Sequence, residues 1–203
     1  NTLCVVTSNV LNRLMISKKG NIRYTRFYHR KNNSNTLSSN RIKKVICDGN
    51  QNIWLATNKG VNRLSISEST HTTIKSYQVT HIGKKDGLQS DKISDIEIGD
   101  DGVIWVGSNQ GLDRIIPNDS GFSVETGQNK GKDNRLSDNT ITALTIDNNG
   151  ILWIGTEDGG LNALNTANYE LSVYKNIPTD PNSLSVNHIL ALFIGKNNTT
   201  WIW

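Results

Sequence analysis

The sequence is poor in cysteine, in proline and in long hydrophobic runs. Its 203 residues include only two cysteines and three prolines. Two cysteines are too few for a disulfide framework or a metal cage, and we interpret Cys4 and Cys47, which stand among apolar residues, as small core residues. No apolar segment approaches the ~20 residues that a membrane-spanning helix needs. These shortages exclude disulfide-rich, collagen-like and membrane-spanning classes for this stretch of chain.

The chain also lacks the usual motifs of catalytic and cofactor sites. It contains no kinase histidine box, no glycine-rich nucleotide-binding motif and no DNA-binding helix pair. Its four histidines share no spacing or metal-binding motif, which argues against a metal site. Glu157 and Asp158 form an acidic pair, but a glycosidase needs two separated carboxylates and these stand side by side in one candidate hairpin. We therefore expect no catalytic residue, no cofactor and no metal ion.

A repeat of about 50 residues runs through the whole sequence. Each copy has three segments in the same order. The first begins with Leu-Ser or a similar pair, the second is apolar and contains a tryptophan, and the third begins with glycine and a branched apolar residue. In the third unit they are residues 136–141, 150–156 and 160–164. The tryptophan position is occupied in turn by Cys4, Trp54, Trp105, Trp153 and Trp201. These positions are 50, 51, 48 and 48 residues apart, so the chain holds about four units. We expect residues 1–203 to begin and to end inside a unit.

Four short segments alternate with turn residues inside each unit. In the third unit they are residues 141–146, 151–156, 161–165 and 170–174. The turns contain glycine after Asn or Asp, as in Asn148-Asn149-Gly150, which suits hairpins that need a residue with positive φ. Four strands in about 50 residues predict a blade of a β-propeller, an all-β fold of four-stranded antiparallel sheets. Because tryptophan recurs at one strand position, we interpret it as packing between blades.

The repeat resembles that of the two-component regulator propeller family, whose pattern is close to L-S-x-N-x-I, D-x-x-G-x-L-W-I-G-T and G-L-N-x-L. The third unit matches this pattern almost throughout, from Leu136, Ser137 and Asn139 to Asp147, Trp153 and Asn162. The other units depart from it at folding positions: Asp91 for Asn, Gly99 and Gly195 for the turn Asp, Gln51 and Asn198 for the turn Gly, and Cys4 for Trp. These departures affect single turns rather than the fold.

The resemblance implies the extracytoplasmic sensor of a hybrid two-component system, a non-enzymatic propeller that detects a ligand, often in the control of polysaccharide use. In that family a propeller typically has seven blades and is followed by a membrane helix and a histidine kinase. We therefore expect a periplasmic segment of a larger propeller, attached to the membrane only through segments outside this chain. The remaining blades, or a second copy in a dimer, are expected to cover its cut edges. The alternatives are a structural or dimerisation propeller without a ligand and, less favoured, a polysaccharide lyase or glycosidase.

Ligand contact is expected on the face that carries the starts of the innermost strands and the hairpins between the second and third strands. One position at the strand starts barely varies in type, and its residues are predicted to shape the turns through hydrogen bonds to the backbone: Asn40, Asp91, Asn139 and Asn187. The following position varies from unit to unit, which suits an asymmetric ligand. The predicted ligand-binding residues are Arg41, Lys92, Thr140 and His188 at that position, with Asn109 and Glu157 in the hairpins.

The distribution of charge points to the same face. Four loops lead from one unit into the next, at residues 29–36, 78–87, 125–135 and 175–183. Their net charges are +2, +1, +1 and 0, which together equal the net charge of +4 of the whole chain. Positive loops attract polyanions, so an acidic oligosaccharide is the expected partner, although the same charges also fit a solvated loop set without a partner. Nucleic acid is not expected, because the loops lack interleaved aromatic residues and recognised binding motifs.

Overall fold

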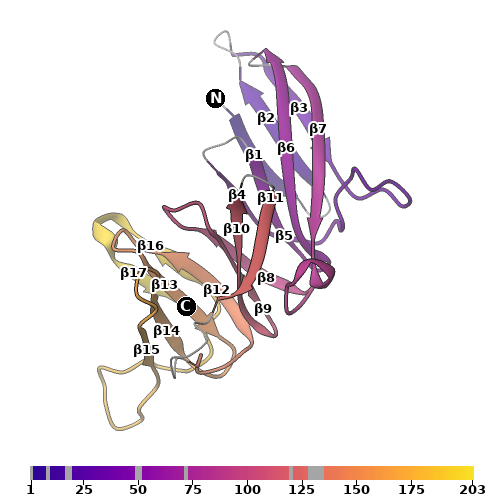
Figure 1. The fold of residues 1–203 in the computed structure, drawn as a ribbon. Coiled ribbons are helices and arrows are strands. Elements are labelled where there is room, and N and C mark those ends of the chain that lie inside the picture. The colour runs from indigo at the N-terminus through magenta and orange to yellow at the C-terminus, as the bar shows by residue number, and fades with distance from the viewer. Residues whose placement is uncertain are drawn as a thin grey trace.

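The computed structural model describes residues 2–7, 10–16, 20–48, 52–70, 73–118, 121–127 and 135–203. These residues form five antiparallel sheets that follow one another in chain order (Figure 1). The three central sheets have four strands each, the first sheet has three and the fifth has two. The all-β prediction and the succession of four-stranded antiparallel blades are therefore confirmed.

The strands follow the chain from sheet to sheet. The first sheet contains β1 (Thr2–Thr7), β2 (Val10–Ile16) and β3 (Ile22–Phe27). The second contains β4 (Ile42–Cys47), β5 (Asn52–Thr57), β6 (Gly60–Thr70) and β7 (Thr73–Ile82), and the third β8 (Ile93–Ile98), β9 (Ile104–Ser108), β10 (Gly111–Asn118) and β11 (Gly121–Thr126). The fourth contains β12 (Ile141–Ile146), β13 (Ile151–Thr156), β14 (Leu161–Asn165) and β15 (Leu171–Tyr174), and the fifth β16 (Leu192–Ile194) and β17 (Thr200–Ile202). Two short 3-10 helices, η1 (Lys84–Asp86) and η2 (Lys196–Asn198), lie in turns.

Each sheet is a meander in which consecutive strands are neighbours. The strands that begin the second to fifth sheets, β4, β8, β12 and β16, lie next to one another, so they form the inner edge of the assembly. Sheets that share an inner edge and fan outward are propeller blades. The strand bounds predicted for the third unit hold for β12, β13 and β14, and β15 begins one residue later than predicted.

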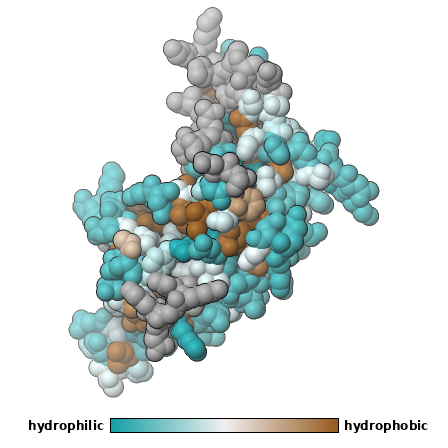
Figure 2. Space-filling view, viewed as in Figure 1, coloured by the Kyte–Doolittle hydropathy of each residue, from teal (hydrophilic) through white to brown (hydrophobic). Residues whose placement is uncertain are grey.

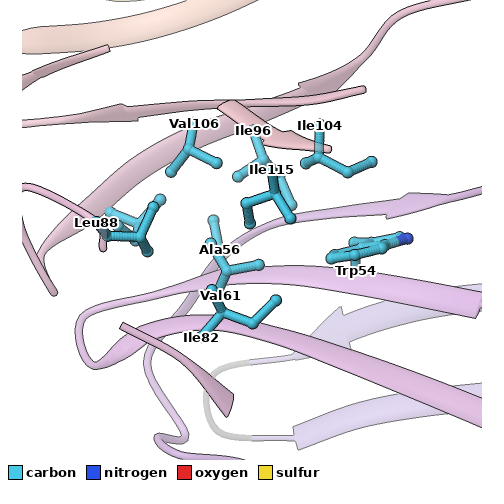
Figure 3. Packing of buried hydrophobic residues seen from close by; sticks show 10 residues of the cluster. Trp54, Ala56, Val61, Ile82, Leu88, Ile96, Ile104, Val106 and Ile115 are labelled. Carbon is cyan, nitrogen blue, oxygen red and sulfur yellow. The ribbon is translucent and has the colours of Figure 1, made fainter. Parts of the chain in front are cut away.

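The hydrophobic core lies between neighbouring sheets. Figure 3 shows Ile96, Ile104, Val106 and Ile115 of the third sheet facing a cluster on the second sheet made of Trp54, Ala56, Val61 and Ile82. Trp54 and Trp105 are 1% and 2% exposed, which confirms that tryptophan at this position packs between blades. Trp153 is half-buried, and Trp201, in the two-stranded fifth sheet, is exposed.

Glycine in the second strand lets neighbouring sheets approach closely. A Cβ atom on Gly107 would lie 2.6 Å from Ile141 Cγ2, on the inner strand of the next sheet. A Cβ atom on Gly155 would lie 2.6 Å from Ile189 Cγ2. Both distances are too short for a real carbon atom, so a larger residue at either position would push two blades apart.

The interpretation of the two cysteines as core residues is wrong for Cys47 and only partly right for Cys4. Cys47 is exposed and Cys4 is half-buried. Cys47 is the last residue of β4, where the strand leaves the sheet for a turn and little packs over it. The two thiols are neighbours across the first and second sheets. Burial is the main cause that raises the pKa of the Cys4 thiol to about 11, and the nearby Cys47 thiol raises this pKa as well.

The surface is mostly polar, with two apolar regions. Hydrophilic residues cover most of the face in Figure 2, and hydrophobic residues gather near its middle, where the second and third sheets meet. In the fifth sheet and the residue that follows it, Phe193, Trp201 and Trp203 are more than half exposed. None of the helices in the described residues has the length and hydrophobicity to span a bilayer.

Candidate functional site

The candidate site is one edge of the sheets, which we call the loop face. It consists of the starts of the inner strands (residues 37–41, 88–92, 136–140 and 184–188) and the hairpins after the second strands (57–60, 108–111 and 156–160). Backbone bonds join the two sets across neighbouring sheets: Gly60 N donates to Asp91 O at 2.7 Å, and Gly160 N donates to Asn187 O at 2.9 Å. The loop face is therefore one continuous edge rather than a set of separate loops.

A side-chain lock fixes the start of the inner strand in the second and fourth sheets. Asn62 Oδ1 accepts a 2.7 Å hydrogen bond from Ser38 N, and Asn62 Nδ2 donates to Ser38 Oγ at 2.6 Å. Ser137 and Asn162 repeat the same pair of bonds at 3.0 and 2.7 Å. Asn62 and Asn162 have no exposed surface, so the serine and asparagine of the repeat pattern serve folding.

The third sheet makes the same lock with two different residues. Asp113 replaces the asparagine, and its carboxylate accepts bonds of 2.9 Å from both Gln89 N and Gln89 Nε2. Burial raises the pKa of Asp113, and the two bonds from Gln89 lower it. An ionised carboxylate only accepts hydrogen bonds, so it needs donors. The glutamine side-chain amide has two N–H donors, whereas a serine hydroxyl has one.

A second set of bonds holds the hairpins against the inner strands. Ser90 Oγ donates to Asn109 Oδ1 at 2.7 Å and accepts a bond of 3.0 Å from Lys92 N. Ser39 bonds in the same way to Asn58 and to the backbone of Arg41. Asn109, a predicted ligand residue, is thus partly used by the fold, and its amide nitrogen remains for contact because it donates no bond to the described residues.

Three of the four residues predicted to shape the turns do so, and most of the loop that precedes the fourth, Asn139, lies outside the described residues. His29 N donates to Asn40 Oδ1 at 2.6 Å, Lys84 N to Asp91 Oδ1 at 2.9 Å, and Asn176 N to Asn187 Oδ1 at 2.7 Å. Each bond closes the loop that leads from the outermost strand of one sheet to the inner strand of the next. These side chains are therefore engaged, which leaves the residues that follow them for contact with a ligand.

The structure places all six predicted ligand residues on the loop face. Arg41, Lys92, Asn109, Glu157 and His188 are exposed, and Thr140 is half-buried. Thr140 and Glu157 are neighbours, because Glu157 N donates to Thr140 O at 2.9 Å. None of the six side chains lines the groove of about 1200 Å³ along β5, β6 and β7, the groove beside Trp153 and Tyr174, or the small groove beside Phe27.

The charged loops are only partly as predicted. Lys84 and Lys85 lie in η1 beside the loop face. The predicted loop at 78–87 is shorter, because β7 continues to Ile82, and Glu125 belongs to β11 rather than to a loop. Three further charged residues of the predicted loops lie outside the described residues: Lys130, Lys132 and Asp133.

A charged cluster on the inner strands is a feature that the sequence reasoning missed. Lys44 of β4 forms an ion pair with Asp95 of β8, and Glu97 lies beside them. Lys44 and Asp95 occupy the same repeat position in consecutive units, opposite Ala56 and Gly107 of the second strands. Opposite charges at aligned positions of adjacent repeats were the available signal. Among the residues that the structure describes, no group of three or more His, Cys, Asp or Glu could hold a metal ion.

Comparison with known families supports the resemblance seen in the sequence. Residues 135–158, which cover the start of the fourth sheet, match the model of the two component regulator propeller family. This match confirms the resemblance in the unit that follows the repeat pattern best. No curated protein sequence matches the chain.

Solved structures share the fold at low sequence identity. The extracellular domain of the putative hybrid two component system BT3049 from B. thetaiotaomicron is 20% identical with a TM-score of 0.68, over 99% of this chain and 26% of that one. PorZ, a surface component of the type-IX secretion system of Porphyromonas gingivalis, is 14% identical with a TM-score of 0.69, over 97% and 28%. Virginiamycin B lyase from Staphylococcus aureus is 19% identical with a TM-score of 0.57, over 97% and 57%. The chain thus spans about a quarter of the first two proteins, and these likenesses show the propeller fold.

Proposed function

We propose that this chain is part of the periplasmic sensor propeller of a hybrid two-component system, and that its loop face recognises an acidic oligosaccharide. Binding there signals to a membrane-bound histidine kinase elsewhere in the protein. The family match in residues 135–158 and the fold shared with the extracellular domain of BT3049 support this assignment. In this role the propeller binds the ligand, and the phosphoryl transfer of signalling takes place in the kinase, outside these residues.

One observation carries the proposal: the loop face combines a rigid frame with exposed side chains that differ between blades. Asn40, Asp91 and Asn187 are held by hydrogen bonds, while Arg41, Lys92 and His188 directly after them are exposed. A frame that is already ordered lowers the entropy that binding must overcome. Two cations and a histidine at equivalent positions suit an anionic ligand that spans several blades.

Titration calorimetry with a tetramer of galacturonic acid, and with a neutral glucose tetramer as the matched ligand, tests this function. The double variant Arg41→Ala with Lys92→Ala should weaken binding of the acidic tetramer by about tenfold or more and change the free energy of unfolding by less than about 0.5 kcal/mol. The control double variant Arg23→Ala with Lys196→Ala removes one arginine and one lysine that are exposed away from the loop face, and should bind normally.

Equal weakening in both double variants, or equal binding of both tetramers, would contradict the proposal. Mass spectra of the titrated sugar should show intact tetramer. Cleavage would instead support a propeller lyase or glycosidase, since virginiamycin B lyase is among the solved structures that share the fold.

A contact role in the assembly of propellers is the second candidate. Phe193, Trp201 and Trp203 in and after the two-stranded fifth sheet are 60%, 55% and 68% exposed, an apolar surface that either the remaining strands of that blade or a second copy would cover. Large apolar patches of this kind commonly mark protein interfaces. Light scattering across a concentration series distinguishes the two roles: a dimer that binds neither tetramer would support contact alone, and a monomer would remove this candidate.

A further inference from the structure

A polar groove of about 1200 Å³ opens between the second and third sheets, on their outer side. Strands β5, β6 and β7 supply most of its wall, including Asn52, Arg63, Ser65, Gln78 and Thr80, and β11 supplies Phe122. One end of the groove reaches η1 through Lys85 and Asp86. None of the six predicted ligand residues of the loop face lines this groove, so it is a separate candidate site.

Arg63 is the unusual residue of the groove. Its guanidinium lies over the ring of Trp54, with Cζ 5.5 Å from the ring centroid. Its Nε is buried without a hydrogen-bond partner, as is Nε of Arg114 in the next sheet. The Arg63 side chain, unlike that of Arg114, also forms no ion pair with the described residues. A largely covered cation without an anion is unfavourable, because burial removes water without supplying a counter-charge.

The next sheet shows the same position with an ion pair. Arg114 of β10 stands opposite Trp105, as Arg63 of β6 stands opposite Trp54. Arg114 Nη2 pairs with Glu125 Oε2 of β11 at 2.6 Å. Its guanidinium is also covered by Tyr169 of the fourth sheet, with Cζ 5.0 Å from the ring centroid.

The second sheet lacks the anion that completes this arrangement. Glu125 lies directly opposite Arg114 in the strand register, whereas the residue directly opposite Arg63 is Thr80 of β7. The space that the Glu125 carboxylate fills beside Arg114 is therefore open beside Arg63, and it belongs to the groove. A ligand carboxylate would fit this space, since a planar carboxylate matches the fork of a guanidinium.

The remaining wall suits a ligand with several hydroxyl groups. Gln78 and Thr80 make no side-chain hydrogen bonds with the described residues, so both can bind a ligand. Of the other titratable groups in the wall, His81 Nε2 is bonded to Thr36 O, and Asp86 accepts a bond from Gly83 N. Lys85 is exposed at the same end of the groove as Asp86.

We propose that this groove binds a uronic acid, with the sugar carboxylate paired to Arg63 and the sugar hydroxyls bonded to Gln78 and Thr80. The bound carboxylate takes the place that Glu125 holds in the next sheet. This inference goes beyond the proposed function, because the groove and the loop face share none of the residues proposed to bind.

Titration calorimetry of the 203-residue chain with glucuronic acid tests the site, with glucose as the neutral match and inorganic sulfate as the simple anion. Glucuronic acid should bind, and glucose and sulfate should bind about tenfold or more weakly. Arg63→Gln should weaken glucuronic acid by about tenfold or more. Arg114→Gln, which removes an arginine that already has a partner, should leave binding unchanged.

A second variant keeps the test decisive if Arg63→Gln does not fold. Thr80→Glu supplies an internal carboxylate at the position opposite Arg63, so it should abolish glucuronic acid binding while every cation of the groove remains. The loop-face variant Arg41→Ala with Lys92→Ala should bind glucuronic acid normally. The proposal is overturned if wild-type chain does not bind glucuronic acid, if Thr80→Glu binds it as well as wild type, or if glucose or sulfate binds equally well.

Discussion

Lys44 Nζ lies 3.1 Å from Asp95 Oδ1, and this ion pair joins the inner strands of the second and third sheets. The other oxygen of Asp95 accepts a 2.9 Å hydrogen bond from Leu144 N on the inner strand of the fourth sheet. Glu97 Oε2 is 3.7 Å from the same ammonium group. Burial raises the pKa of Glu97, and Lys44 lowers it. One carboxylate thus bonds to both neighbouring blades, and one lysine lies near two carboxylates.

Lys44→Met should destabilise the protein in a pH-dependent way. A carboxyl whose pKa is raised by folding favours the folded state below its ordinary pKa, and this contribution is lost as pH rises through the folded pKa. Loss of Lys44 raises the pKa of Glu97 further, so the variant should lose about 1–2 kcal/mol near neutral pH, a value reduced for the partial exposure of the lysine. The loss should shrink as pH falls through the raised pKa of Glu97, because a protonated carboxyl needs no cation.

Urea denaturation across a pH series measures this effect. Lys43→Met is the control, because Lys43 is the exposed neighbour in the same strand. An equal loss in the two variants, or a loss that does not depend on pH, would show that the cluster does not stabilise the inner strands.

Gly99→Asp should stabilise the third sheet. In the second and fourth sheets, the turn aspartates Asp48 and Asp147 accept hydrogen bonds from Trp54 Nε1 at 2.9 Å and Trp153 Nε1 at 3.1 Å. Gly99 stands at that position in the third sheet, and the buried Trp105 Nε1 has no partner. A carboxylate there should add about 1 kcal/mol to the free energy of unfolding.

Thermal unfolding of three variants checks this prediction. Gly99→Ala adds a Cβ without a carboxylate, and either substitution must displace Asp101 Oδ1, which would lie 2.7 Å from the new Cβ. Asp147→Gly makes the reverse change in the fourth sheet and should destabilise it. Equal effects of Ala and Asp at position 99 would mean that no bond to Trp105 forms.

Trp54→Ala and Trp201→Ala should differ strongly although both residues occupy the same repeat position. Trp54 is 1% exposed between two sheets, so its removal should cost about 3–5 kcal/mol. Trp201 is 55% exposed, so its removal should cost less than about 1 kcal/mol. Chemical denaturation of both variants gives the two values, and similar losses would argue against the packing between the second and third sheets.

Iodoacetamide should label Cys47 much faster than Cys4 in the folded protein. The pKa of about 11 leaves Cys4 with about a hundredfold less thiolate near neutral pH than its ordinary value of 9.0 would give. Cys47 is exposed. Mass spectrometry of peptides at successive times follows both sites, and labelling in urea should make the two rates similar. Comparable rates in the folded state would mean that Cys4 is not shielded.

The sequence predicts the blade best where every element of the repeat is present. Asp147, Gly150 and Trp153 mark the turn and second strand of the fourth sheet, and the predicted bounds of three of its strands hold without change. The repeat pattern does not predict the long hairpin of β6 and β7, because the pattern ends before the outermost strand and predicts a loop that includes residues 78–82. Outer strands carry fewer packing constraints, so their sequences say less about their length.

In the candidate site, contacts within one loop could be predicted from the sequence, whereas contacts between strands of different sheets could not. The role of Asn40, Asp91 and Asn187 was predictable, because a short polar side chain next to a turn has few partners other than nearby backbone. The pair of Lys44 with Asp95 and the open groove at Arg63 depend on which strands become neighbours in different sheets. Such contacts can be recognised in the sequence only after the repeats are aligned, by comparing Thr80 with Glu125 or Lys44 with Asp95.

The lock between the start of the inner strand and the third strand closes within a single repeat. Both halves of it, such as Ser38 and Asn62, lie fewer than thirty residues apart, and the third sheet has changed both halves together to Gln89 and Asp113. A gene duplication that copies one repeat therefore copies a complete lock, and new blades can be added to the array without new partners having to arise elsewhere. Substitution of one half alone breaks the lock, so the two positions are expected to change as a pair during the divergence of blades.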